Sequence, residues 1–280
     1  MSQAIAVSHG EFGRAALYRL NKGIITHAHR EGHLIFYVDG DHATVPMRDE
    51  TYQVNPEYAV AVSPWEPHAF DLEDKATCIC LVLYIKPMWF LENSPSAEFA
   101  LKFGCSELRL SEEMIDFRQR LTTLLLDDEN QQQFDQLLFG LTKASFDESW
   151  HKDHGAYKTQ AYNRFSDFRV RRSLRLIQER MGDDIDMAQL AKGVGLSRPH
   201  FFKLFKQYLG VTPNVYLNTL RSERAIEELL NTEKTVTDIA FDLGFSSQAS
   251  FTRFFSSNVG IAPSEYRRVA HVTDGAFPMM

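Results

Sequence analysis

Polar side chains suited to nucleic-acid contacts recur in two short segments near the C-terminus. The outward face of the first segment carries Arg198, Phe202, Lys203 and Lys206, and that of the second carries Ser247, Gln248, Thr252 and Arg253. Arg and Gln form paired hydrogen bonds with base edges, whereas Lys and Ser suit phosphate oxygens. If both segments are helices, these residues predict two exposed faces that read double-stranded DNA at two places.

An internal repeat positions these side chains. Four positions of LAKGVGLSRPHFFKLFKQYLGVTP recur 49 residues later, and three more recur 50 residues later. The pairs are Leu190/Ile239, Ala191/Ala240, Gly195/Gly244, Ser197/Ser246, Phe205/Phe255, Gly210/Gly260 and Pro213/Pro263. An apolar helix, a turn glycine, a serine N-cap and a second helix with a buried phenylalanine pair are typical of helix-turn-helix units. The repeat therefore predicts two such units, at residues 187–208 and 236–258.

The segment between the repeats predicts one long helix. From Val215 to Asn231 the sequence VYLNTLRSERAIEELLN keeps apolar residues at helical spacing and contains no Gly or Pro. A helix of this length spans about 25 Å at 1.5 Å per residue. It would hold the two units roughly one turn of DNA apart, about 34 Å.

In these features residues 170–269 resemble the DNA-binding domain of the AraC/XylS family of transcription regulators. The resemblance lies in the two repeats, in LRSERAIEELL between them and in the ending PSEYR. It implies two helix-turn-helix units that enter adjacent major grooves on one face of the DNA. The candidate DNA-binding residues are then Arg198, Pro199, Phe202, Lys203, Ser247, Gln248, Ala249, Thr252 and Arg253. This chain departs from the family where Pro199 removes a backbone donor, and where Ser256 stands in place of a frequent Lys.

Length and charge fit a two-domain protein. The 280 residues exceed the usual size of a single domain. Residues 168–270 carry fifteen Lys and Arg against eleven Asp and Glu, a net charge of +4, whereas the rest of the chain carries −11. A basic module on an acidic body suits a DNA-binding protein and disfavours acidic partners for the remainder.

Residues 1–110 predict a domain of short strands. ITHAHREGHLIFYVDG, ATVPMRDETYQV, YAVAVSPWEPHAF and ATCICLVLYI alternate or run apolar between turn residues, as in sandwiches and barrels. The domain also resembles cupins, through Gly23, His27, His29, His33 and Gly40, and through Pro64, Pro67 and His68. The predicted fold class is α+β multidomain: a cupin-like β jelly roll with a helical hairpin, then an all-α double helix-turn-helix domain at residues 169–270.

The histidines are the candidate ligands of the N-terminal domain. His27 and His29 share one strand face, and neutral imidazoles bind zinc, iron or nickel. The cupin resemblance implies that His68 joins them from a neighbouring strand, but cupins that bind metal usually have Glu where this chain has His33. Three roles stay open: a divalent-metal site at His27, His29, His33 and His68, effector contacts from these histidines and Trp65, or a motif without metal. The aromatic residues nearby, which either line a ligand pocket or form the core, are Phe36, Trp65, Phe70 and Tyr84.

The remaining segments predict helices and a linker. Residues 111–150 predict two helices joined at 127–130, and the family resemblance implies that they form a homodimer; packing on the jelly roll is the alternative. The polar residues 151–168 predict a linker. No signal peptide or apolar stretch of about 18 residues is evident, so we expect a cytoplasmic protein without a membrane partner. Three reduced thiols are expected, at Cys78, Cys80 and Cys105.

Together these features predict a sequence-specific transcription regulator and not an enzyme. We expect an activator that acts with RNA polymerase and responds to a small-molecule effector, which shifts the orientations or dimers able to engage two DNA half-sites. The alternative is a metal-dependent cupin enzyme that carries a DNA-targeting module. A third hypothesis is regulation by a partner protein that docks on the N-terminal domain.

Overall fold

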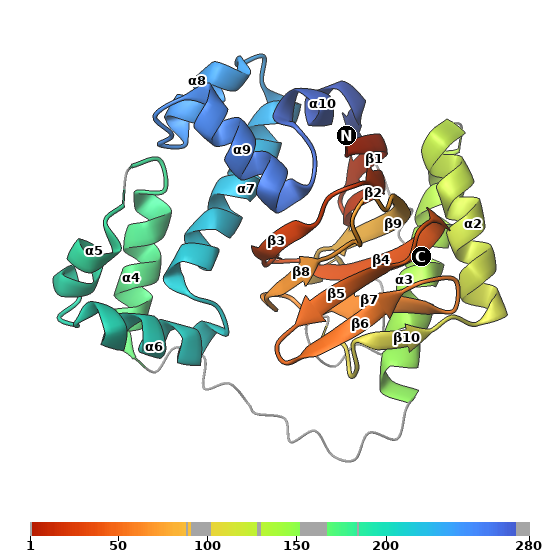
Figure 1. Cartoon of the computed structure of the whole chain (residues 1–280), viewed down its shortest axis with the longest axis horizontal. Helices are drawn as coiled ribbons and strands as arrows, with labels where there is room; N and C mark the ends of the chain where they lie inside the picture. The colour runs from red at the N-terminus through yellow and green to blue at the C-terminus, as the bar shows by residue number, and fades with distance from the viewer. Residues whose placement is uncertain are drawn as a thin grey trace.

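The computed structural model describes residues 2–87, 89–90, 102–127, 130–151, 167–183 and 185–272. These residues form an N-terminal part of two β-sheets and two helices, and a C-terminal part of helices beside it (Figure 1). The chain is therefore a mixed α and β protein in the predicted order, with sheets first and helices last. Residues 152–166, most of the predicted linker, lie outside the described residues.

The N-terminal sheets enclose an apolar interior between them. The larger sheet has the strand order β10-β7-β4-β9-β2-β1-β11 and the smaller has the order β3-β8-β5-β6. The strands are β1 (Gln3–Gly10), β2 (Gly13–Leu20), β3 (Ile24–His27), β4 (Gly32–Gly40), β5 (Ala43–Met47), β6 (Glu50–Val54), β7 (Tyr58–Val62), β8 (His68–Phe70), β9 (Cys78–Ile85), β10 (Glu107–Arg109) and β11 (Ala270–Val272). Side chains from both sheets meet in this interior, among them Ile35 and Cys80 from the larger and Val45 and Phe70 from the smaller.

Helices α2 (Glu112–Asp127) and α3 (Gln131–His151) cover the other face of the larger sheet. Phe36 packs there with Leu121 and Leu138, because neighbouring residues of a strand point to opposite faces of the sheet. The core alternative therefore holds for three of the four aromatic residues: Phe36 lies on the helix-covered face, whereas Phe70 and Tyr84 lie in the interior.

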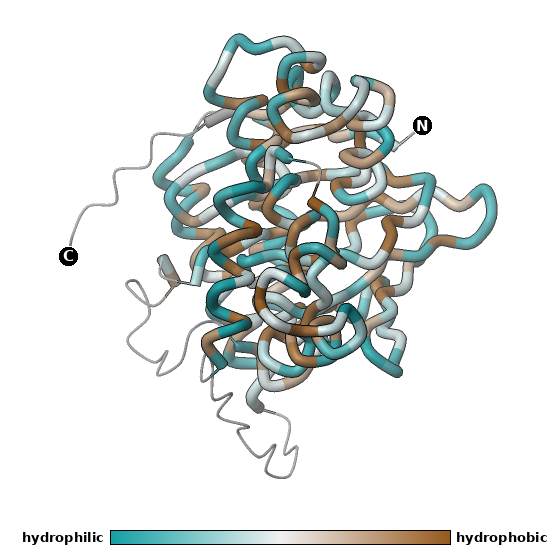
Figure 2. The backbone as a smooth tube through the Cα atoms, turned by 90° about the vertical axis from the view of Figure 1, so that its left-hand side faces the viewer, coloured by the Kyte–Doolittle hydropathy of each residue, from teal (hydrophilic) through white to brown (hydrophobic). Residues whose placement is uncertain are grey.

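The C-terminal part contains two similar helix pairs joined by a long helix. Its elements are α4 (Phe168–Glu179), α5 (Met187–Gly193), α6 (Arg198–Leu209), α7 (Pro213–Asn231), α8 (Val236–Asp242), α9 (Gln248–Val259) and α10 (Pro263–Val269). Gly195 and Gly244 form the turns within the α5–α6 and α8–α9 pairs with φ of +75° and +77°, which glycine adopts without a steric penalty. Hydrophobic and hydrophilic residues alternate along these helices, as expected for amphipathic packing (Figure 2).

The helix caps differ in detail from the prediction. The N-cap of α9 is Ser247 and not Ser246; its hydroxyl accepts from the Ser250 N–H at 3.2 Å. The extra residue of the second repeat lies before this cap and moves it by one position. Ser197 is the N-cap of α6 as predicted, although its side chain makes no capping hydrogen bond among the described residues. Helix α7 begins at Pro213, two residues before the predicted start, because proline is favoured in the first turn of a helix.

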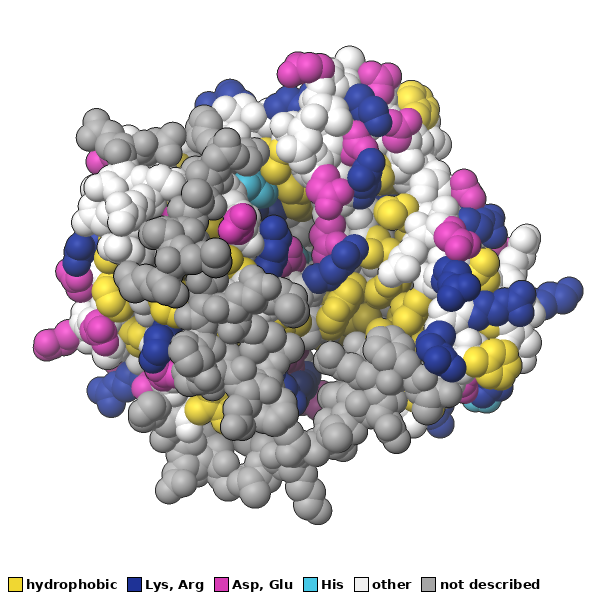
Figure 3. Space-filling view, turned by 180° about the vertical axis from the view of Figure 1, so that it is seen from behind, with side chains coloured by type: hydrophobic (Ala, Val, Ile, Leu, Met, Phe, Trp, Pro, Cys, Tyr) yellow, Lys and Arg dark blue, Asp and Glu magenta, His cyan; other side chains and the backbone are white. Residues whose placement is uncertain are grey.

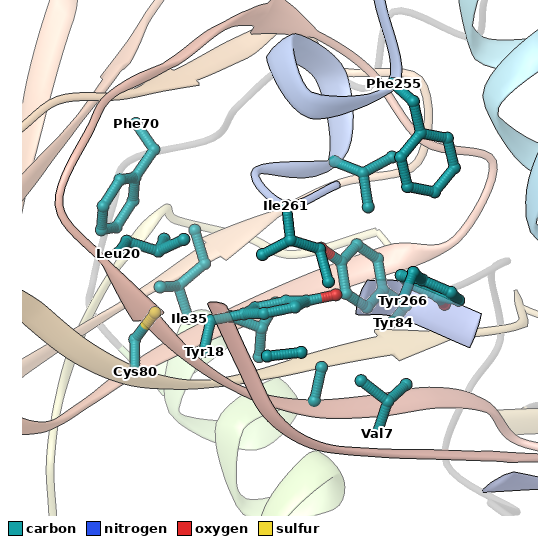
Figure 4. Packing of buried hydrophobic residues seen from close by; sticks show 14 of the residues in the cluster. Val7, Tyr18, Leu20, Ile35, Phe70, Cys80, Tyr84, Phe255, Ile261 and Tyr266 are labelled. Atoms are coloured by element: carbon teal, nitrogen blue, oxygen red, sulfur yellow. The ribbon is translucent and has the colours of Figure 1, made fainter. Parts of the chain in front are cut away.

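The two parts of the molecule share one apolar core. Tyr18 and Tyr84 from the larger sheet lie with Phe255 of α9 and Tyr266 of α10 (Figure 4). The backbone also crosses this interface, since β11 pairs in parallel with β1 of the larger sheet. The end of the helical part is therefore joined to the sheet by strand pairing as well as by apolar contacts.

Polar contacts cross the same interface. The Thr219 hydroxyl of α7 donates to the Ala28 carbonyl at 3.0 Å, and Arg30 Nε lies 2.6 Å from a carboxylate oxygen of Glu223. Burial raises the pKa of Glu223 to about 8; the negative charge of Glu31 adds to this effect and the charge of Arg30 opposes it. The interface thus contains a carboxyl group that changes charge near neutral pH.

Two remaining predictions concern the state of the cysteine thiols and the presence of a membrane-spanning helix. Cys78, Cys80 and Cys105 form no disulfide among the described residues, and the first two are buried in β9. None of the described helices is both long and apolar enough to cross a membrane.

Candidate functional site

The first candidate surface is the exposed face of α6. Arg198, Pro199 and Lys203 are exposed and Phe202 is half-buried. The Arg198 guanidinium lies 5.2 Å from the centre of the Phe202 ring, a cation–π contact that holds it at the start of the helix. The opposite face of α6 buries two phenylalanines in the core, so the helical period leaves the predicted residues outside.

Helix α9 presents the equivalent surface in the second pair. Gln248, Ala249 and Arg253 are exposed, and Thr252 is half-buried. The Thr237 hydroxyl donates to Gln248 Oε1 at 2.7 Å, which orients the amide at the helix start. The structure therefore places the predicted residues of α9 on one accessible end of the helix.

The charges and neighbours of these two faces add further detail. Acidic partners among the described residues bind Arg224 and Lys234, but none is found for Lys203 or Arg253. His200 is also exposed on the first turn of α6 and was missed by the sequence analysis. The signal in the sequence is its position directly before Phe201, which turns His200 away from the buried face of the helix.

The second candidate site is a cluster of four histidines between the sheets. His27 of β3 and His68 of β8 pair in register, with ring centroids 4.4 Å apart. One ring nitrogen from each of His27, His29 and His68 can be chosen so that all three lie within 4.8 Å of one another. The ring of His33 from β4 lies 5.0 Å from the rings of both His29 and His68. The structure thus brings together all four histidines that the sequence singled out.

Backbone carbonyls orient two of these rings. His27 Nδ1 lies 2.7 Å from the Ile25 oxygen, and His68 Nδ1 lies 2.9 Å from the Glu66 oxygen. Because a carbonyl only accepts, each Nδ1 carries the proton and each Nε2 keeps a lone pair. Burial lowers the pKa of His27 to about 4 and that of His68 to about 3, so both rings are neutral at neutral pH.

Several nitrogens of the cluster are buried without a hydrogen bond. His29 Nε2, His68 Nε2 and both ring nitrogens of His33 have no partner among the described residues. A buried polar atom left in this state costs about 1–3 kcal/mol. Converging imidazole nitrogens are ligands that Zn²⁺ and related divalent ions accept. The donor set therefore fits a divalent metal ion.

A buried arginine connects this cluster to the C-terminal part. The Tyr84 ring lies 4.4 Å from the His33 ring, and the Arg14 guanidinium lies 3.6 Å from the centre of the Tyr84 ring. Arg14 Nη1 donates to the Tyr266 hydroxyl of α10 at 3.0 Å. Arg14 is not predictable from the sequence as part of this site, because a lone arginine in a strand is usually exposed.

Trp65 occupies a different place from the histidines. Its backbone N–H donates to the His29 carbonyl at 2.7 Å, and its φ of +63° is unusual for a residue with a side chain. Its ring stacks on Tyr216 of α7, with centroids 5.1 Å apart and an interplanar angle of 24°. The backbone of Trp65 therefore touches the histidine cluster while its ring faces the C-terminal helices.

Comparison with known proteins defines the class of the helical part. A protein-family model described as a helix-turn-helix domain matches residues 190–269. An uncharacterized HTH-type transcriptional regulator of Staphylococcus aureus (strain COL) is 36% identical over 119 residues, which cover 42% of this chain and 16% of that protein. The regulatory protein PocR of Salmonella typhimurium is 33% identical over 102 residues, covering 36% of this chain and 34% of PocR. The chain thus spans only about a sixth and a third of the lengths of these relatives.

Most of the chain is similar in fold to a solved structure. ToxT from Vibrio cholerae superposes with a TM-score of 0.56 and 16% identity, covering 91% of this chain and 97% of ToxT. At this identity the similarity concerns the fold alone. With the helix-turn-helix matches, these findings place the protein among helix-turn-helix proteins of mixed α and β fold. Residues 190–269 are therefore a helix-turn-helix domain similar to those of transcriptional regulators.

Proposed function

We propose that this protein binds double-stranded DNA in a sequence-specific manner and regulates transcription. The observation that carries the proposal is that α6 and α9 present similar exposed polar and basic faces in two units of the same design. Helix α7, which joins the units, has 19 residues. At 1.5 Å per residue it spans about 28 Å, close to the roughly 34 Å of one DNA turn.

The side chains suggest a division of roles on DNA. Gln248 and Arg253 are suited to base edges, and Lys203 to a phosphate or a guanine. Ala249 and Thr252 offer methyl groups for contact with thymine. The Ser247 hydroxyl already caps α9, which makes it less suited to a direct contact. Arg198, Pro199 and Phe202 complete the first surface.

The N-terminal part is proposed to sense an effector. Under this proposal residues 1–110 are a cupin-like jelly roll, and residues 111–150 mediate the formation of a homodimer. Residues 169–270 bind DNA, and the protein acts as an activator together with RNA polymerase. The contacts from the histidine cluster through Tyr84 and Arg14 to Tyr266 support an effector response, because they connect the sheet interior to the DNA-binding part. The matched relatives are named as regulators, so we do not adopt the enzyme alternative.

A divalent metal ion is proposed to contribute to this response. His27, His29 and His68 would hold it, with His33 beside them. A bound ion would supply a fixed positive charge and satisfy nitrogens that are otherwise unpaired. Its binding would also stiffen β3 and β8, which pair through His27 and His68.

Selection of bound sequences from random double-stranded DNA tests the DNA-binding proposal. We expect the full-length protein to enrich a motif with two boxes about one helical turn apart. Arg253→Ala should weaken binding by about 1–3 kcal/mol and relax the preference at one base pair. Arg19→Ala, which changes an exposed arginine of β2, should have no such effect. Failure to enrich any motif would refute the proposal, and equal weakening on every sequence would assign Arg253 to a phosphate.

Metal analysis and thermal unfolding test the histidine site. One zinc ion per chain should bind and raise the free energy of unfolding by about 2.7 kcal/mol at a hundredfold excess over Kd. His29→Ala should abolish this gain, whereas the control His42→Ala, at an exposed histidine outside the cluster, should retain it. Equal zinc stabilisation of wild type and His29→Ala would exclude the cluster as the site.

A further inference from the structure

A groove lies between the two parts of the molecule and is separate from both candidate sites described above. It has a volume of about 350 Å³ and is lined by Trp65 from the N-terminal part and by residues of α4, α6 and α7. On the back of the molecule, hydrophobic and basic side chains lie together between the two parts (Figure 3). Small-molecule sites commonly have volumes of about 300–1,000 Å³ and occur between domains.

The apolar wall of the groove is held in place by contacts on both sides. The stacked rings of Trp65 and Tyr216 form a flat surface, and Leu174 and Leu209 extend it. The Tyr216 hydroxyl accepts from Gln178 at 2.9 Å, which fixes the ring from α4. The backbone N–H of Trp65 donates to the His29 carbonyl at 2.7 Å, which anchors the backbone that carries the other ring. The wall is therefore preorganised for a flat apolar group.

Two arginines at the groove give it a positive charge. Arg171 and Arg175 lie one turn apart on α4, are exposed, and line the groove. Elsewhere in this segment Arg169 pairs with Asp167, and Arg180 pairs with Asp183. No acidic partner for Arg171 or Arg175 occurs among the described residues. The two guanidinium groups are therefore available to an anion from solution.

We propose that this groove binds a small organic anion with a flat apolar body, such as an aromatic carboxylate. The ring would lie on the Trp65–Tyr216 wall, and the carboxylate would accept hydrogen bonds from Arg171 and Arg175. Trp65 belongs to the N-terminal part and Tyr216 to the C-terminal part. A bound anion that contacts both rings therefore stabilises the packing of the two parts against each other. Binding itself does not depend on the proposed function, but an effect of the anion on DNA binding does rest on it.

Fluorescence titration of the full-length protein with 1-anilinonaphthalene-8-sulfonate, and its displacement by 2-naphthoate, tests the site. The double variant Arg171→Gln/Arg175→Gln should bind 2-naphthoate at least about tenfold more weakly, because charge-assisted hydrogen bonds are lost. Arg172→Gln is the matched control, since Arg172 is exposed on the same helix but does not line the groove. It should bind as wild type does. The neutral analogue 2-naphthol should displace the dye much less well than 2-naphthoate.

Three results would overturn this assignment. These are equal affinity of the double variant and wild type, equal displacement by 2-naphthol, and an equal loss in Arg172→Gln. DNA affinity, measured on the same samples with and without 2-naphthoate, separates this inference from the proposed function. If the protein binds 2-naphthoate but no DNA, the proposed DNA-binding function is refuted and the groove assignment stands. If it binds DNA but not 2-naphthoate, the groove assignment is refuted and the proposed function stands. A double variant that loses only DNA affinity would assign both arginines to the DNA backbone.

Discussion

Tyr266→Phe is expected to destabilise the protein strongly, although it removes a single oxygen atom. The Tyr266 hydroxyl accepts from Arg14 Nη1 at 3.0 Å and lies 2.8 Å from His9 Nε2. Arg14 is only 7% exposed, and no carboxylate pairs with it among the described residues. The phenol therefore provides much of the polar environment of a buried positive charge.

The magnitude follows from what the substitution leaves unpaired. A hydrogen bond to a charged group contributes about 1.5–3 kcal/mol, and the contact with His9 adds about 1 kcal/mol. The expected loss is therefore about 2.5–4 kcal/mol, which lowers Tm by about 4–7 °C for a chain of 280 residues. Burial, followed by the charge of Arg14, lowers the pKa of His9 to about 3, so His9 is neutral near pH 7 and adds no second positive charge beside Arg14.

Tyr216→Phe is the matched control for this prediction. It also removes a tyrosine hydroxyl from the domain interface, but that hydroxyl accepts from the neutral side chain of Gln178. Its expected cost is about 0.5–1.5 kcal/mol. Scanning calorimetry of both variants, with secondary structure checked by circular dichroism, decides the comparison. A Tm decrease for Tyr266→Phe no larger than that for Tyr216→Phe would refute the reasoning about the buried charge.

Two further predictions concern the turns and the interface. A Cβ at Gly244 would lie 2.5 Å from the Gly182 carbonyl oxygen, whereas one at Gly195 would meet nothing within 4 Å. Urea unfolding should therefore show a loss of about 1–2 kcal/mol for Gly195→Ala from φ strain alone, and more than about 3 kcal/mol for Gly244→Ala; equal losses would contradict this. Because the pKa of Glu223 is raised to about 8, the folded state holds its proton more tightly than the unfolded state. Its contribution to stability is complete below about pH 4.5 and is lost as the pH rises to about 8. Glu223→Gln should reduce the decrease of Tm with pH across this window. An unchanged slope of Tm against pH would show that other groups cause the decrease.

The two helix-turn-helix units could be predicted because their signals are local. A turn glycine, a cap and a pair of phenylalanines four residues apart each act within a few residues of the chain. The cap of α9 was misplaced by one residue, from Ser247 to Ser246. Repeat alignment alone does not show on which side of the cap an inserted residue falls.

The histidine cluster could be predicted only in part. The sequence predicted His27 and His29 on one strand, but β3 ends at His27 and His29 follows it. Only strand pairing brings in the others: His27 pairs with His68, and His33 with Tyr84 of β9. Neighbouring residues also do not show on which face of the larger sheet Phe36 packs. An apolar residue in a strand buried on both sides has two available cores, and only the covering helices show which one it joins.

The amino-acid sequence alone was enough to predict the repeated helical units, their polar faces and the order of sheets and helices, because periodicity and turn chemistry depend on neighbouring residues. Only the tertiary structure showed that Arg14 is buried against Tyr266, 252 residues away, and that Trp65 stacks on Tyr216. These contacts join surfaces from opposite ends of the chain. Their formation depends on how the helical part packs on the sheets, and no local pattern of residues encodes that packing.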